Sequence, residues 1–338
     1  MSVLVASCVL GLSHLFVLLL WLCKLGLKSL PEKLFFSFLL SAAAYLVGAS
    51  GDFPVWGERL ITALYTGAAG FFWLLCSALF NDNYRLKTWH LVLVFATMLL
   101  PLVHIALSAE AGLYRLILVA VPQLLEYAMI LIGLATTLFY WRGDLVEERR
   151  IIRAGTLGLV GVYLLGAVGS KHFFAHNLWW DESGSYVIAA AIAVAFSLYL
   201  GGLRPNVLFV PRKVALPTIL IDENNKLAGR LRQTMQAGIY RETGLTIGNL
   251  AKQIDMQEHN LRRLINQKLG YRNFNDFLNS YRIEEAASRL KGEDLPILTI
   301  ALDSGFGSLT SFNSAFKQTF GMPPSQYRKA AVSQQNQA

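Results

Sequence analysis

The sequence predicts an all-α protein in two parts, an N-terminal bundle of seven membrane-spanning helices and a C-terminal bihelical domain with two helix-turn-helix motifs. Three observations support this prediction: seven apolar stretches, a change in composition near residue 204, and two helix-turn-helix patterns beyond it. Of the 338 residues, 54% are hydrophobic and only 15% are charged, against about 25% charged in ordinary soluble domains. This composition argues against a wholly cytosolic enzyme.

The seven apolar stretches are close to the length of about 20 residues that crosses roughly 30 Å of hydrocarbon. They cover residues 3–23, 34–49, 60–80, 89–107, 113–141, 152–168 and 186–203. A helix of a large soluble core would show a polar face at helical spacing, and these stretches lack such a face. The pattern therefore favours a bundle with the lipid bilayer as its partner over a soluble helical core.

The basic residues of the short loops predict how the bundle is oriented. Loops after odd-numbered stretches carry nine Lys and Arg residues, whereas loops after even-numbered stretches carry three. Because loops rich in Lys and Arg stay in the cytoplasm, we expect the N-terminus outside and the C-terminal part inside. The sequence thus predicts a multi-pass membrane protein with its C-terminal part in the cytoplasm.

The fifth apolar stretch holds a candidate ligand site. An ionisable side chain within a span is costly, and it is a functional candidate for that reason. Glu126 lies near the middle of the stretch, one turn beyond Pro122, and Gln123 adds a second polar group near the same level. Gln123 and Glu126 either line a pocket for a small-molecule signal or form an interhelical hydrogen bond that only holds the bundle together.

No motif in the apolar part predicts a catalytic, metal or cofactor site. The three cysteines are scattered within apolar stretches, which fits packing residues rather than a disulfide framework or a metal site. His172 and His176 are four residues apart, but no third ligand follows at a defined spacing. The spans also lack a Ser/His/Asp order and a glycine-rich phosphate loop. We therefore expect no enzyme activity, no metal and no cofactor.

The C-terminal part differs from the bundle in charge. Residues 1–203 carry 12 Lys and Arg against 11 Asp and Glu, whereas residues 204–338 carry 18 against 11. Pro205, Pro211 and Pro217 exclude a continuous helix between the two parts, and whether this segment pairs as strands stays open. The predicted organisation is a membrane domain over 1–203, a linker over 204–223, a helical domain over 224–330 and a disordered tail over 331–338.

Two helix-turn-helix patterns fill the C-terminal domain. Their helices lie at 245–254 and 257–269 in the first pattern, and at 297–304 and 308–320 in the second. Gly270 and Gly321 follow the second helix of each pattern and are expected to end it in a left-handed conformation. A helix over 274–291 joins the patterns and would span about 27 Å. Because one DNA turn is ~34 Å, both reading helices, the second of each pattern, would enter the major groove on one face.

The residues of these patterns resemble the AraC/XylS family of transcription regulators. The resemblance is carried by Leu250-Ala251, Arg282-Ile283-Glu284-Glu285-Ala286, Ile300-Ala301, Gly305-Phe306, Phe312, Phe316-Lys317, Phe320-Gly321, Pro323-Pro324 and Tyr327-Arg328. It covers about residues 227–330 and implies a domain that binds promoter DNA and contacts RNA polymerase. The apolar part does not resemble the soluble sugar-binding domain common in that family, so the resemblance implies no effector.

The resemblance also implies a set of DNA contacts. These are His259, Arg262 and Arg263 in the first reading helix, Leu309, Thr310, Asn313 and Ser314 in the second, and Lys317 and Arg328 at phosphates. Arginine suits bidentate pairing with guanine, although Arg263 equally fits a phosphate clamp or an ion pair. The family frequently has Arg where Ser314 stands, so we expect the second helix to read sequence weakly.

Taken together with the resemblance, the sequence predicts a membrane-anchored one-component transcription regulator of the bacterial inner membrane. The bundle would sense a small molecule or a membrane signal, and no kinase or phosphoacceptor motif intervenes. The alternatives are a membrane enzyme or transporter with an appended regulatory domain, and a constitutive regulator whose spans only anchor it. The sequence leaves open whether the chain forms a homodimer and whether it activates or represses transcription.

Overall fold

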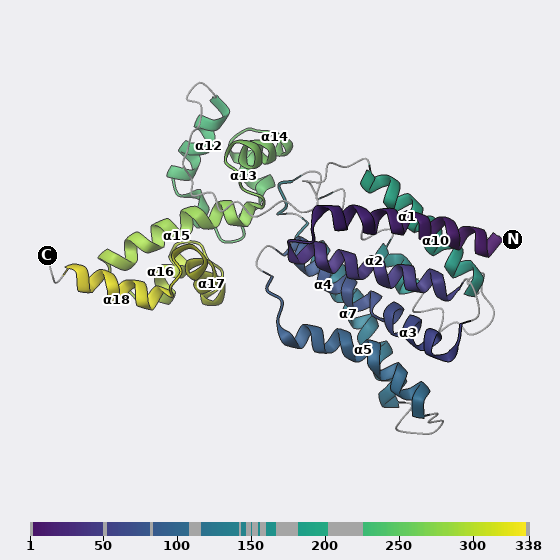
Figure 1. The fold of residues 1–338 in the computed structure, drawn as a ribbon. Helices are drawn as coiled ribbons and strands as arrows, with labels where there is room; N and C mark the ends of the chain where they lie inside the picture. Colours follow the sequence, from purple (N-terminus) through teal and green to yellow (C-terminus); the bar gives the residue numbers. More distant parts are fainter. Residues whose placement is uncertain are drawn as a thin grey trace. The chain divides into compact units, whose positions relative to one another are not determined.

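The computed structural model describes residues 3–49, 53–81, 84–107, 116–141, 143–146, 150, 155, 160–166, 182–201 and 226–335 (Figure 1). Among these residues the secondary structure is helical apart from one isolated β-bridge, so the all-α class is confirmed. The chain divides into an N-terminal unit, residues 1–142 and 148–211, and a C-terminal unit, residues 143–147 and 212–338. The sequence does not predict that residues 143–147 join the C-terminal unit.

The N-terminal unit is built from long apolar helices. They are α1 (Val3–Leu25), α2 (Leu30–Gly48), α3 (Val55–Thr66), α4 (Ala68–Phe80), α5 (Thr88–Leu107), the π-helical turn η1 (Leu116–Ala120), α7 (Val121–Phe139) and α10 (Glu182–Gly201). Four of the described segments are long and apolar enough to cross a membrane, namely Val3–Leu25, Leu30–Gly48, Val55–Phe80 and Ile117–Phe139. The count of seven spans stays a prediction, because Thr88–Val103 and Gly184–Tyr199 are shorter apolar helices and the sixth stretch lies partly outside the described residues.

The helices of the N-terminal unit pack closely around one apolar core. Helix α1 runs along α10, and α4 packs against both α2 and α7 (Figure 1). Gly11 permits the first of these contacts, because a Cβ there would lie 2.9 Å from Cα and Cβ of Ala190. Phe72 and Ile130, from α4 and α7, are buried at the centre.

The C-terminal unit consists of shorter helices at nearly the predicted places. They are α12 (Lys226–Gln236), η3 (Ile239–Arg241), α13 (Ile247–Gln253), α14 (Glu258–Arg263), the π-helical turn η4 (Leu264–Lys268), α15 (Phe274–Gly292), α16 (Ile297–Asp303), α17 (Leu309–Phe320) and α18 (Pro324–Gln335). Thr246 and Ser308 cap α13 and α17, each accepting a backbone hydrogen bond from the residue three positions on. Gly270 and Gly321 have the expected positive φ. Helix α18 ends at Gln335, within the range expected to be a disordered tail.

Helix α15 joins the two motifs by contributing to a separate core at each end (Figure 1). Phe277 and Leu278 are buried with the first motif, whereas Ile283 and Leu290 are buried with the second. Arg282 lies between these groups and donates to the carbonyl oxygens of Tyr240 and Glu242, at 2.6 and 2.9 Å; burial lowers the pKa of its guanidinium group. The motifs therefore share one rigid connecting helix.

Candidate nucleic-acid interface and ligand cavity

The first reading helix, α14, separates the predicted contact residues into two groups. His259 and Arg263 are one helical turn apart and both exposed, whereas Leu261 is buried in the first core. Arg262 is only 8% exposed. The structure therefore brings His259 and Arg263 together on the solvent face and places Arg262 apart from them.

Among the described residues, Glu258 and Asp144 hold the Arg262 guanidinium group. Its Nε donates to Oε1 of Glu258 at 3.0 Å, within α14. Its Nη1 donates to the backbone carbonyl oxygen of Asp144 at 2.6 Å, although these residues are 118 positions apart in the chain. Asp144 belongs to residues 143–146, which we call the docking segment. Sequence reasoning missed this contact because the docking segment lies in a short loop after an apolar stretch and carries no motif.

The docking segment pairs with the residues that lead into α15. The Phe274 N–H donates to the Gly143 carbonyl oxygen at 2.8 Å, and the Leu145 N–H donates to the Arg272 carbonyl oxygen at 3.0 Å. These bonds flank an antiparallel bridge between Asp144 and Asn273. The Leu145 side chain is 4% exposed and belongs to the core of the first motif. The docking segment is thus an integral part of the C-terminal unit.

The second reading helix, α17, places its predicted contact residues in solvent. Leu309, Thr310, Asn313, Ser314 and Lys317 are all exposed. The side facing the core carries Phe312 and Phe316, both 0% exposed. Phe312 packs edge-on against Phe306 of the turn, and Phe316 against Tyr327 of α18. Lys317 is the one cation among the predicted contact residues of α17.

Arg328 is less available to a phosphate than the sequence suggests. It is partly buried, and its Nη2 donates to the Leu295 carbonyl oxygen at 2.6 Å. This bond links α18 to the loop before α16. Like Arg262, Arg328 therefore joins parts of the C-terminal unit through a hydrogen bond to a backbone carbonyl oxygen.

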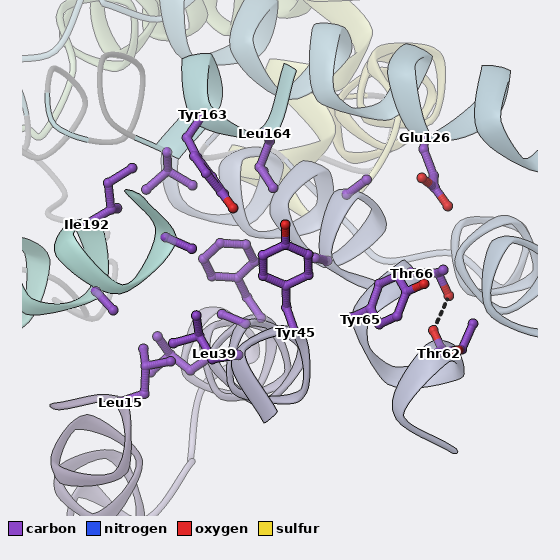
Figure 2. Close-up of a pocket in the computed structure, with 18 of the residues that line it drawn as sticks. Leu15, Leu39, Tyr45, Thr62, Tyr65, Thr66, Glu126, Tyr163, Leu164 and Ile192 are labelled. Carbon is purple, nitrogen blue, oxygen red and sulfur yellow. Dashed lines mark hydrogen bonds between the residues drawn. The ribbon is translucent and has the colours of Figure 1, made fainter. Parts of the chain in front are cut away.

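A cavity of about 350 Å³ lies within the N-terminal unit, and Gln123 and Glu126 line it. In Figure 2, Glu126 lies on the same side of the view as Thr62, Tyr65 and Thr66, whereas Leu15, Leu39 and Ile192 lie on the opposite side. Both polar residues come from the first turns of α7, which starts next to Pro122 after the π-helical turn. The structure thus places the two predicted sensing residues at one cavity.

Two tyrosines stand in the middle of the cavity, and sequence reasoning missed them. Tyr45 and Tyr163 are labelled in Figure 2. The Tyr45 hydroxyl lies 2.9 Å from Oγ of Ser185, and the Tyr163 hydroxyl donates to the Ser185 carbonyl oxygen at 3.0 Å. They come from α2 and from residues 160–166, so only the fold brings them together. Among the described residues that line the cavity, the ionisable groups are the Glu126 carboxyl and tyrosine hydroxyls, and none of these residues is Lys, Arg or His.

The histidines of the apolar part do not add a metal site to the described structure. His14 forms a hydrogen bond between Nδ1 and the Leu10 carbonyl oxygen of its own helix, at 2.9 Å. The side chain of His104, and His172 with His176, lie outside the described residues. Within the part of the chain that the structure describes, no three His, Cys, Asp or Glu side chains gather into a group able to hold a metal ion.

The fold of the C-terminal unit and its two exposed helix faces define a helix-turn-helix domain, a class of DNA-binding protein. Residues 250–330 match the family described as "Helix-turn-helix domain". The domain is of the AraC type, so the resemblance noted in the sequence is confirmed for this part of the chain.

Known proteins with similar sequences are regulators. The chain is 34% identical over 96 residues to an HTH-type transcriptional regulator of Staphylococcus aureus strain COL, which is 28% of this chain but only 13% of that protein. It is 28% identical over 95 residues to the probable transcription factor PqrA of Proteus vulgaris, 28% of this chain and 77% of PqrA. No solved structure matches the chain. These likenesses cover the C-terminal part of the chain and support a DNA-binding transcription regulator.

Proposed function

We propose that the chain is a membrane-anchored transcription regulator that binds promoter DNA through α14 and α17. The observation that carries this proposal is the pair of exposed reading faces, joined by one helix that belongs to both cores. Two such helices at fixed separation suit successive major-groove segments on one side of a duplex. Chromatin immunoprecipitation of the tagged full-length protein, combined with expression profiling of a deletion strain, tests the proposal. An absence of enriched promoters would refute it.

Within this proposal, the exposed side chains make the DNA contacts. His259 and Arg263 read bases or phosphates from α14, and Lys317 neutralises a phosphate beside α17. The second reading helix contributes Leu309, Thr310, Asn313 and Ser314, which offer hydrogen bonds and apolar contact without positive charge. We assign no direct DNA contact to Arg262 or Arg328, because their guanidinium groups already donate to backbone carbonyl oxygens.

The anchoring of the N-terminal unit in the bilayer is supported by its surface as well as by its helix lengths. Large apolar side chains are exposed along the outside of the helices, including Phe16, Val17 and Leu20 of α1 and Phe139 of α7. A water-soluble protein rarely exposes apolar patches of this extent. With the predicted orientation, the N-terminus is external and the C-terminal unit is cytoplasmic.

The cavity at Gln123 and Glu126 is the proposed sensing site. Its volume of about 350 Å³ falls within the usual range for small-molecule sites. The described wall is mainly apolar, with the Glu126 carboxyl and no cation among its residues. Such a wall favours a compact apolar ligand whose head group donates hydrogen bonds, such as an amine or an alcohol, over a carboxylate.

Matched naphthalene probes test this ligand class. The full-length protein in lipid nanodiscs should be stabilised against heating by 1-naphthylmethylamine more than by 1-naphthalenemethanol, and least by 1-naphthoate. Glu126→Gln should remove the preference for the amine, whereas Glu58→Gln, at an exposed carboxyl outside the cavity, should leave it unchanged. Equal stabilisation by all three probes would argue for a role of Glu126 in packing alone.

We propose that the cytoplasmic output is activation of transcription, through the contact with RNA polymerase that the resemblance to the AraC/XylS family implies. Transcription with purified polymerase, an identified promoter and the full-length protein tests this, since an increase in transcript supports activation and a decrease indicates repression. Whether two copies bind one promoter as a homodimer is measured in the same system from the stoichiometry of the protein–DNA complex.

A further inference from the structure

A long-range contact of the C-terminal unit involves residues 143–146, which belong to this unit although they follow α7 in the chain. Residues 143–146 follow α7 after a connection of only a few residues, and residue 160 begins the next described apolar segment. Yet Leu145 fills the core of the first motif, and two backbone hydrogen bonds fix the docking segment to the residues before α15. A loop between two apolar helices thus completes the DNA-binding unit.

The contact reaches both helices that set the position of the first motif. The pairing with Arg272 and Phe274 fixes the start of α15, the helix that carries both motifs. The bond from Arg262 to the Asp144 carbonyl oxygen fixes α14, the first reading helix. Loss of the docking segment would remove both of these attachments and the Leu145 side chain from the core. The docking segment therefore helps to hold α14 against the start of α15.

The docking segment is also the covalent continuation of the proposed sensing helix. Helix α7 supplies Gln123 and Glu126 to the cavity and ends at Phe139, four residues before Gly143. A shift of α7 by a fraction of a helical turn must be taken up by those few residues or be passed to the docking segment.

We propose that the surface formed by α14 and the start of α15 is a docking site for residues 143–146 of this chain, through which α7 controls DNA binding. The docked form holds α14 and α17 at the separation that DNA requires, and the undocked form does not. Arg262 is a positioning residue in this contact, not a base-reading residue. The inference rests on the proposed DNA-binding function and adds the element that regulates it.

Hydrogen exchange of the full-length protein in lipid nanodiscs tests docking independently of DNA. The amide hydrogens of Leu145 and Phe274 are both donated across the contact, so they should exchange slowly in the native protein. Leu145→Ala and Arg262→Ala should each accelerate exchange at both amides, and the double variant should show less than the sum of the two effects. Arg263→Ala, the exposed neighbour of Arg262, is the matched control and should leave exchange unchanged.

The same variants test whether docking controls DNA binding. Where the docked population falls to a tenth, operator affinity should fall about tenfold, with the preference among operator variants unchanged. If Arg262→Ala alters base preference while exchange at Leu145 and Phe274 stays slow, Arg262 reads DNA and the inference is wrong. If exchange accelerates while operator affinity stays at the native value, docking has no regulatory role and the inference is also wrong. If none of the variants, including Arg263→Ala, affects DNA binding, it is the proposed function that fails.

A longer connection tests the control by α7. Inserting Gly-Ser-Gly-Ser after Trp141 lengthens the connection while leaving the cavity and the docking segment in place. Saturation with 1-naphthylmethylamine should change exchange at Leu145 and Phe274 in the native protein and not in the insertion variant. An identical response in both proteins would exclude α7 as the route of the signal.

Discussion

Replacing Gly305 with alanine should loosen the turn of the second helix-turn-helix motif far more than the same replacement at Gly307. Gly305 has a φ of +91°, a conformation that costs an L-residue about 1–2 kcal/mol. A Cβ there would lie 2.7 Å from the carbonyl oxygens of Tyr240 and Arg241. These are backbone atoms that cannot rotate away, and overpacking of this kind costs about 1–3 kcal/mol. The expected loss of stability is therefore about 2–5 kcal/mol.

Gly307 provides the matched control two residues further along the chain. Its backbone does not have a positive φ, and a Cβ would meet only Cγ2 of Thr243 at 3.7 Å, an ordinary contact distance. Alanine at this position should change stability by less than about 0.5 kcal/mol. The difference between the two variants isolates the close approach of the turn to η3 from any general effect of an added methyl group.

The assay is hydrogen exchange at the Phe306 amide, which donates to the Ala301 carbonyl oxygen at 3.1 Å and reports opening of the turn. A loss of at least 2 kcal/mol accelerates exchange by about 30-fold or more. Operator affinity of the full-length protein should fall in parallel, since α17 follows this turn. Equal exchange rates in the two variants would refute the packing argument and imply that η3 moves away from the turn at little cost.

Three further predictions concern DNA binding and topology. Arg263→Ala should lower operator affinity by about 1–3 kcal/mol and relax the preference at one base position if it reads guanine, as measured on a panel of operator variants. Lys317→Ala should weaken binding to all sequences equally and reduce the salt dependence by about one unit of slope, as measured at several salt concentrations. A phosphatase fused to Ala338 should be inactive and a fluorescent protein there should be bright, because the C-terminus is expected in the cytoplasm.

Much of the C-terminal unit follows from local sequence signals. A capping residue such as Thr246 or Ser308 accepts a hydrogen bond from a residue three positions on, and a terminating glycine needs only its own positive φ. Apolar residues at helical spacing likewise identify α13 and α17 without knowledge of their partners. Each signal lies within one helix and its ends, which is why the sequence predicts these helix limits to within a few residues.

The sites depend on contacts that have no local signal. The sequence predicts Gln123 and Glu126 because a polar group within a span is conspicuous, but Tyr45 and Tyr163 are ordinary members of apolar stretches until the fold brings them to the same Ser185. Arg262 fits the pattern of a DNA-reading arginine, and only its hydrogen bond to the Asp144 carbonyl oxygen shows that it contacts the docking segment. Pairing across 118 residues depends on the arrangement of whole helices, which spacing within one segment does not encode.

The position of the docking segment changes how the role of the N-terminal unit must be tested. A constitutive regulator, merely concentrated at the membrane, should still regulate when its spans are replaced by an unrelated anchor. That replacement would also remove residues 143–146 and leave the first motif without Leu145, so loss of regulation would not demonstrate sensing. For the same reason, a fragment that starts at the linker is an incomplete DNA-binding unit.

The decisive chimera carries residues 143–146 on a loop between two foreign spans. If this chimera still regulates transcription but no longer responds to cavity ligands, residues 143–146 are sufficient for docking and α7 is required for sensing.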